Sequence, residues 1–329
     1  MKALCIGRSD YNFFSNVDNF ATESKKQVLS DVIEGSGGTG VTAAHLLGKY
    51  GAETYLGSVV GDDTFGNLIK KELERNGVHT EYMETGFDKR TSISMIITKK
   101  DTKDQIIYNI NKEKLVLKKN EFQMLPDLIY SDGYDYGATL SAYNKFSDKI
   151  TILNAKECTQ EMVELCKYPK YIIAPQEFAE WVSGQKIDFD NSGSLVTVFS
   201  ALLNRFVKKE IIVTLGSKGA LYISNNQIRV MPGLASEVVD TTGSGDIFGG
   251  AFAYGLLQGY DLEKAITFAN IAAGLSVSKV GIKESIPEIN EVMNLFNQKY
   301  AAVQEQPAAP APQADPNAQP PAGTPPVAQ

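Results

Sequence analysis

Short apolar runs alternate with amphipathic segments along most of the chain. The apolar runs predict buried strands at residues 3–6, 54–60, 128–130, 150–153, 171–174, 211–214 and 221–223. Segments with apolar residues at helical spacing predict helices at residues 39–50, 63–76, 159–166, 194–206, 244–257 and 262–279. Strands that alternate with helices are typical of a mainly parallel sheet covered on both faces. We therefore expect an α/β fold with three layers, α/β/α.

Two stretches interrupt this alternation, residues 11–35 and 81–115. Both are rich in Thr, Ser and Lys, and their apolar residues occupy alternate positions, which predicts half-exposed strands without partner helices. A small sheet added to the α/β domain accounts for both stretches. Such a sheet is either a lid over an active site or an ordinary extension at the edge, and the pattern alone favours neither.

The end of the chain differs from the rest in composition. Residues 304–329 contain eight of the 13 prolines and are otherwise mostly Ala, Gln and Gly. A segment of this composition cannot bury enough apolar surface to fold. We therefore predict one folded domain at residues 1–303 and a disordered tail at residues 304–329.

Composition and charge exclude several classes of function. The net charge of −7 argues against nucleic acid or an anionic membrane surface as the main partner. The three cysteines lack metal-ligand spacing and fit a reducing cytoplasm, and no apolar run is long enough to span a bilayer. His45 and His79 are the two histidines, and we predict that both are structural rather than members of a triad or a metal site.

The segment at residues 240–246, Asp-Thr-Thr-Gly-Ser-Gly-Asp, directly precedes an apolar helix. The backbone amides of Gly243, Ser244 and Gly245 would then point outward from the first turn, where a helix binds anions. A carboxylate beside an anion site needs a function, and Asp246 is suited to take a proton from a hydroxyl that attacks a phosphoryl group. A tight strand-to-helix turn would explain the glycines but not the two flanking aspartates.

Two other glycine-rich segments allow more than one interpretation. Residues 35–40 match the G-x-G-x-x-G dinucleotide fingerprint, but no acidic residue ends a second strand about 20 residues later, as ribose recognition requires. The turn from Thr214 to Gly219 is a plain hairpin on spacing alone. A G-x-x-x-x-G-K-[ST] motif is absent from the sequence, so a Walker-type nucleotide hydrolase is not expected.

Residues 240–246 resemble the second signature of the ribokinase-like (PfkB) carbohydrate kinases, D-T-x-G-A-G-D-x-F, with Ser244 in place of the alanine. Residues 37–66 resemble the first signature, and residues 7–12 are similar to the first strand and substrate loop. The resemblance runs in consistent order over roughly residues 1–300. It implies a ribokinase-like fold in which the small sheet is a lid, which often also forms a homodimer contact.

The resemblance also implies roles for individual residues. Asp246 would be the catalytic base, and Gly243, Ser244 and Gly245 would form the anion hole. The substrate loop and first signature imply sugar contacts by Asp10, Asn12, Gly37, Gly38 and Thr42. The family has Asp where Asn12 stands and Asn where Thr42 stands, so these sugar contacts are expected to be altered.

The remaining implied roles concern ATP and metal ions. ATP contacts are implied for Gln176, Thr214, Gly216, Gly219 and Asn270. The family's Asn-x-x-Glu motif, which organises phosphate-bound Mg²⁺, falls on Gln176 and Ala179, so a rewired Mg²⁺ network is expected. In potassium-activated members a monovalent cation is held at the positions of Asp240, Thr242, Ser276, Gly281 and Ser285.

We therefore predict a cytoplasmic, ATP- and Mg²⁺-dependent kinase that phosphorylates a hydroxyl of a small sugar or sugar-like molecule. A nucleoside kinase of the same fold is one alternative. A non-catalytic, regulatory sugar-binding protein is another; Asn12, Thr42 and Ala179 favour it, and the intact segment 240–246 argues against it. A dinucleotide oxidoreductase has the least support.

Overall fold

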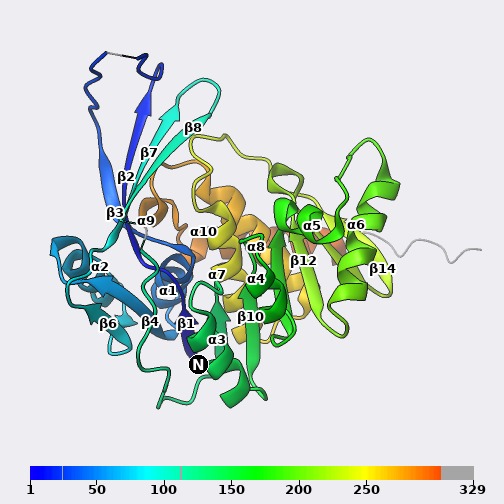
Figure 1. Cartoon of the computed structure of the whole chain (residues 1–329). Helices are drawn as coiled ribbons and strands as arrows, with labels where there is room; N and C mark the ends of the chain where they lie inside the picture. Colours follow the sequence, from blue (N-terminus) through cyan, green and yellow to red (C-terminus); the bar gives the residue numbers. More distant parts are fainter. Residues whose placement is uncertain (24, 112, 305–329) are drawn as a thin grey trace, which may run out of the picture.

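A central ten-stranded sheet forms the body of the computed structural model, which describes residues 1–23, 25–111 and 113–304 (Figure 1). Across the sheet the strands are β14 (Gln227–Met231), β13 (Ala220–Ser224), β12 (Glu210–Thr214), β11 (Tyr171–Pro175), β10 (Ile150–Asn154), β9 (Leu128–Ser131), β1 (Lys2–Ile6), β4 (Glu53–Gly61) and β5 (Val78–His79), while β6 (Met83–Gly86) also pairs with β4. Neighbours from β12 to β5 run parallel, whereas β13 and β14 continue the sheet antiparallel. The predicted mainly parallel sheet is confirmed.

Helices cover both faces of the sheet. One face packs against α1 (Thr39–Lys49), α2 (Thr64–Arg75), α7 (Ser244–Leu257), α8 (Leu262–Ser276) and α10 (Ile289–Gln304), and the other against α3 (Tyr136–Lys145), α4 (Gln160–Leu165), α5 (Gln176–Ser183) and α6 (Ser192–Arg205). The positions of the side chains of strand β1 explain why its sequence is apolar throughout. Ala3 and Cys5 belong to the first core, whereas Leu4 and Ile6 belong to the second. Both faces of the strand are therefore buried, which confirms the three-layer α/β/α arrangement.

A separate four-stranded sheet rises from one side of the body, above α2 and β4 in Figure 1. Its strands are, in order, β3 (Ile33–Gly37), β2 (Asp10–Val17), β7 (Ser92–Lys99) and β8 (Gln105–Ile110). Strands β2 and β7 pair in parallel, and the outer pairs are antiparallel. The expected small sheet is present, and we call it the small sheet below.

The prediction that this sheet has no partner helix was wrong for strand β2, which packs against α2. The ring of Phe65 in α2 lies 5.0 Å from the ring of Tyr11 and 5.9 Å from that of Phe13. Alternate residues of a strand share one face, so Tyr11 and Phe13 face the helix together.

Several elements differ from the pattern-based expectation. Helices α3, α5 and α10 were not predicted, and the short helix α9 (Ile282–Ser285) follows α8, which ends at Ser276 rather than at residue 279. Helix α10 ends at Gln304, so the predicted tail lies outside the described residues from 305 onward. None of the helices among the described residues is both long and apolar enough to cross a bilayer.

Candidate active site

Three charged residues that the sequence analysis did not assign to the site lie just beyond the carboxyl ends of parallel strands. The loop after β1 carries Arg8, Asp132 follows β9, and Lys156 lies just beyond β10. In open α/β sheets ligands bind at this edge, because the strand-to-helix loops meet there.

Asp246 occupies the first turn of α7 and is buried, with 7% of its surface exposed. Gly243 is the residue that precedes the helix, and its positive φ of 78° suits glycine. The ammonium group of Lys156 forms a hydrogen-bonded ion pair with Asp246 Oδ1. Sequence reasoning missed Lys156, because nothing in its local pattern connects it with α7.

The amides at the start of α7 are not equivalent. The N–H of Ser244 donates to the carbonyl of Thr241 at 3.2 Å, which corrects the expectation that its amide points outward. The turn that ends at Gly243 brings that carbonyl within reach of residue 244. A Cβ built on Gly245 would meet nothing within 4 Å, so the space beside this residue is open on its side-chain side.

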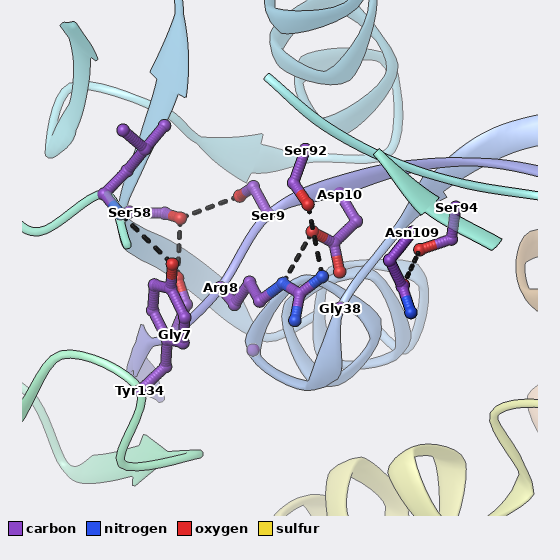
Figure 2. Close-up of polar contacts among 12 residues, drawn as sticks. Gly7, Arg8, Ser9, Asp10, Gly38, Ser58, Ser92, Ser94, Asn109 and Tyr134 are labelled. Atoms are coloured by element: carbon purple, nitrogen blue, oxygen red, sulfur yellow. Dashed lines mark hydrogen bonds and ion pairs between the residues drawn. The ribbon is translucent and has the colours of Figure 1, made fainter. Parts of the chain in front are cut away.

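Arg8 dominates the polar contacts of the predicted sugar-binding loop (Figure 2). Its Nε donates to Asp10 Oδ1 at 2.6 Å, and its Nη2 donates to Ser92 Oγ of the small sheet at 3.2 Å. The guanidinium carbon lies 5.8 Å from the centroid of the Tyr134 ring. The carboxylate of Asp10 is therefore already engaged by a cation.

The glycines after β3 allow two chain segments to approach closely. A Cβ on Gly37 would lie 2.0 Å from Asn12 Nδ2, and one on Gly38 would lie 2.2 Å from the Arg8 carbonyl oxygen. Gly38 also has a φ of 100°, which favours glycine. The hydroxyl of Thr42, whose side chain has no exposed surface, donates to the Gly38 carbonyl at 3.0 Å. Thr42 therefore points into its own helix.

Asp132 connects the loop after β1 with its surroundings, and the sequence analysis did not identify it. Its Oδ2 accepts from the amides of Arg8 (3.0 Å) and Gly40 (3.1 Å), and its Oδ1 accepts from the amide of Tyr134 (2.9 Å). Burial raises the pKa of this carboxyl to about 6; the three amides act in the opposite direction, and nearby Asp246 adds to the rise. The feature of the sequence that could have identified Asp132 is the Asp-Gly pair directly after a buried strand.

The predicted ATP-binding residues lie around a second part of the site. A cavity of about 400 Å³ is lined by Pro232, Gly233, Leu234, Ala235, Asn270, Ile271, Leu295, Gln298 and Lys299. The turn from Thr214 contains the short helix η1 (Gly216–Lys218) and closes with a 2.7 Å bond from the Leu215 amide to the Gly219 carbonyl. It lies against the cavity wall, since a Cβ on Gly233 would be 2.6 Å from the Ser217 carbonyl oxygen. Thr214, Gly216, Gly219 and Asn270 therefore lie in one region.

Gln176 begins α5 and donates to Glu180 Oε1 at 2.7 Å. Glu180 also accepts from Lys186 Nζ at 2.6 Å and from the Ile187 amide at 3.0 Å. Burial pushes the pKa of Glu180 upward, but the bonds from Lys186, Gln176 and Ile187 outweigh it and lower the pKa. Glu180 is thus committed to neighbouring side chains rather than presented to a metal ion.

The residues predicted to hold a monovalent cation are only partly brought together. Asp240 Oδ1 accepts from the amide and the hydroxyl of Thr242, at 2.9 and 2.7 Å, and Asp240 Oδ2 accepts from the Gly281 amide at 3.4 Å. The hydroxyls of Ser276 and Ser285 donate instead to carbonyls of their own helices. Across the described ranges, no cluster of three or more His, Cys, Asp or Glu side chains could hold a metal ion.

Both histidines lie away from the candidate active site described above. His45 is buried in α1 with Nε2 unpaired, and burial lowers its pKa to about 4. His79 stacks on Tyr55, with ring centroids 4.5 Å apart. Packing rather than chemistry accounts for their positions.

Comparison with known proteins identifies the family of the chain. The profile described as "pfkB family carbohydrate kinase" matches residues 1–289. The ribokinase of Bacillus subtilis (strain 168) is 28% identical over 319 residues, which cover 90% of this chain and 100% of that protein. A putative ribokinase from Agrobacterium tumefaciens has a TM-score of 0.82 at 22% identity, covering 91% of this chain and 98% of that one. Arabidopsis thaliana ribokinase, solved with ribose and ATP, has a TM-score of 0.73 at 20% identity, covering 90% and 98%. The structural likenesses show a ribokinase fold, and the profile match shows that the chain belongs to the PfkB family of carbohydrate kinases.

Proposed function

We propose that the protein transfers the γ-phosphoryl group of ATP to a hydroxyl of a small sugar or sugar-like molecule, with Asp246 as the general base. The observation that carries this proposal is the position of Asp246, buried in the first turn of α7 beside Gly243 and Gly245. A helix start offers amides and a positive dipole end to an anion. A carboxylate at that point can take the proton of the attacking hydroxyl.

In the proposed reaction the sugar oxygen forms a bond to the γ-phosphorus, and the bond from that phosphorus to the β,γ-bridging oxygen breaks. The bonding electrons leave with ADP, and the hydroxyl proton passes to Asp246. The adenine would occupy the cavity beside Asn270, with the phosphates along the turn from Thr214 to Gly219. The sugar would lie near Asn12 and Asp10, beneath the small sheet acting as a lid.

Bound Mg²⁺ would neutralise the phosphate charges of ATP. Since the described residues offer no cluster of three ligands, the phosphates themselves would provide most of its coordination. Glu177, in the first turn of α5, is the carboxylate that we assign to its water shell, because Glu180 is already paired. A potassium requirement stays a prediction.

A turnover and binding panel tests the proposal. We expect ATP-dependent phosphorylation of at least one sugar, and stabilisation by ATP with Mg²⁺ but not by NAD. A ligand at 100 times its Kd adds about 2.7 kcal/mol to the free energy of unfolding. Turnover of nucleosides alone would favour a nucleoside kinase, and sugar binding without turnover would favour a regulatory protein.

A further inference from the structure

The ion pair between Lys156 and Asp246 places a positive charge at the proposed reacting centre. Lys156 comes from the loop after β10, 90 residues before Asp246 in the chain. The side chain of Lys156 is 38% exposed and that of Asp246 is 10% exposed. Lys156 is therefore the more exposed partner of the pair.

This geometry leaves hydrogen-bonding capacity at both partners. An ammonium carries three N–H donors, and the bond to Asp246 Oδ1 uses one of them. Asp246 Oδ2 has no hydrogen-bond partner within the described residues and can receive a substrate proton.

We propose that Lys156 is a catalytic residue. Its ammonium group is paired with Asp246 before transfer and stabilises the negative charge of the phosphoryl group during transfer. When the hydroxyl proton reaches Asp246, the carboxylate becomes neutral and no longer balances the ammonium. At the same moment, negative charge on the transferred group must be stabilised. An interaction that strengthens only in the transition state accelerates the reaction. This inference rests on the proposed function, in which Asp246 is the base.

Three variants separate a catalytic role from a structural one. Lys156→Met keeps the aliphatic stem and removes the charge, and Lys156→Arg keeps the charge. Lys167→Met controls for the loss of a lysine ion pair as such, because Lys167 pairs with Glu164 at 2.6 Å on the surface of the protein. We expect Lys156→Met to lower kcat by about 10²- to 10³-fold with KM for ATP nearly unchanged, because one charge-stabilising donor is lost. Lys156→Arg should recover at least part of kcat, and Lys167→Met should match the parent.

The split between kcat and KM gives a readout that a structural role would not move. A loss of folding would lower the amount of active protein without a selective effect on the chemical step. A kcat of Lys156→Met within about threefold of the parent would overturn the proposal.

A binding measurement separates failure of this inference from failure of the proposed function. MgADP with aluminium fluoride mimics the planar phosphoryl group, and its affinity can be measured by calorimetry without turnover. We expect Lys156→Met to bind MgADP like the parent but to bind the fluoride complex at least about tenfold more weakly. Equal binding of the mimic by both proteins would reject the role of Lys156. Absence of sugar phosphorylation by the parent would instead reject the proposed function.

Discussion

The side-chain amide of Gln105 lies 2.7 Å from the hydroxyl oxygen of Thr242. The same nitrogen lies 3.2 Å from Asp240 Oδ1. Gln105 begins strand β8 of the small sheet, whereas Thr242 and Asp240 belong to the segment that leads into the proposed anion hole. A hydrogen bond therefore connects the small sheet directly with the segment that would hold the transferred phosphoryl group.

Because of this contact, we expect Gln105→Leu to increase the hydrolysis of ATP by water relative to the phosphorylation of sugar. If the small sheet is a lid, its bond to Thr242 favours the closed, water-excluding state. We expect kcat/KM for the sugar to fall by about tenfold and the fraction of ATP lost to water to rise, with little change in ATP affinity. The measurement is the ratio of ADP to sugar phosphate. Thr102→Val, which alters the turn of the same hairpin, should leave that ratio unchanged; a normal ratio in Gln105→Leu would contradict the coupling.

Asp246→Asn tests the proposed base. The amide keeps the shape of the side chain but cannot accept a proton, so kcat should fall by about 10²- to 10⁴-fold while ATP binds nearly as before. Steady-state turnover and calorimetric titration with ATP measure the two effects. Activity within a factor of two of the parent would remove Asp246 as the base.

Asn12→Asp tests substrate selectivity. The neutral amide of Asn12 should hold vicinal sugar hydroxyls less firmly than a carboxylate, and Asp10 is drawn to Arg8 at 2.6 Å rather than free to compensate. We expect the parent to prefer a substrate other than unmodified ribose, and Asn12→Asp to raise kcat/KM for ribose by about tenfold. A sugar panel on both proteins checks this. If ribose is already the best substrate of the parent, with a KM that Asn12→Asp does not change, the prediction fails.

The burial of His45 predicts that the folded protein loses stability in mild acid. Burial lowers its pKa to about 4 from 6.5, so the unfolded state binds more protons than the folded state between these values. Stability from this group is full above pH 6.5 and is lost as the pH falls toward 4. We expect the parent to lose about 2 kcal/mol more than His45→Leu between pH 7 and pH 5, measured by urea unfolding.

The raised pKa of Asp132 changes the stability with pH in the opposite direction. Its folded pKa of about 6 lies above the ordinary 3.8, so its contribution to stability is full below 3.8 and is lost as the pH rises through 6. Because Asp132 is present in both proteins, its effect cancels in the difference between the parent and His45→Leu. Parallel pH curves for the two proteins would mean that His45 is not a buried neutral base.

The alternation of strands and helices was readable from the sequence because burial on two faces leaves a local, repeating pattern. The small sheet was predicted from a different local pattern, the alternation of apolar residues within residues 11–35 and 81–115, which is typical of strands buried on one face. Segment 240–246 was assigned from local spacing alone, because small residues and a carboxylate stand together at the start of a helix, and its role as an anion site stays a prediction. Helix α5 was missed, since its short amphipathic turn at Gln176 directly follows the apolar strand β11.

Only the tertiary structure decided which side chains complete the site. Lys156 meets Asp246 across 90 residues, Arg8 meets Asp132 across 124, and Gln105 meets Thr242 across 137. None of these pairs has a local signature, because each partner forms its own loop or strand regardless of the other. The hydroxyl of Thr42 could likewise have faced a substrate or its own helix, and in the structure it donates to the Gly38 carbonyl at 3.0 Å. The sequence determined the fold and the position of the proposed base through local periodicity, whereas the charges that surround this base depend on which strand ends the sheet brings side by side.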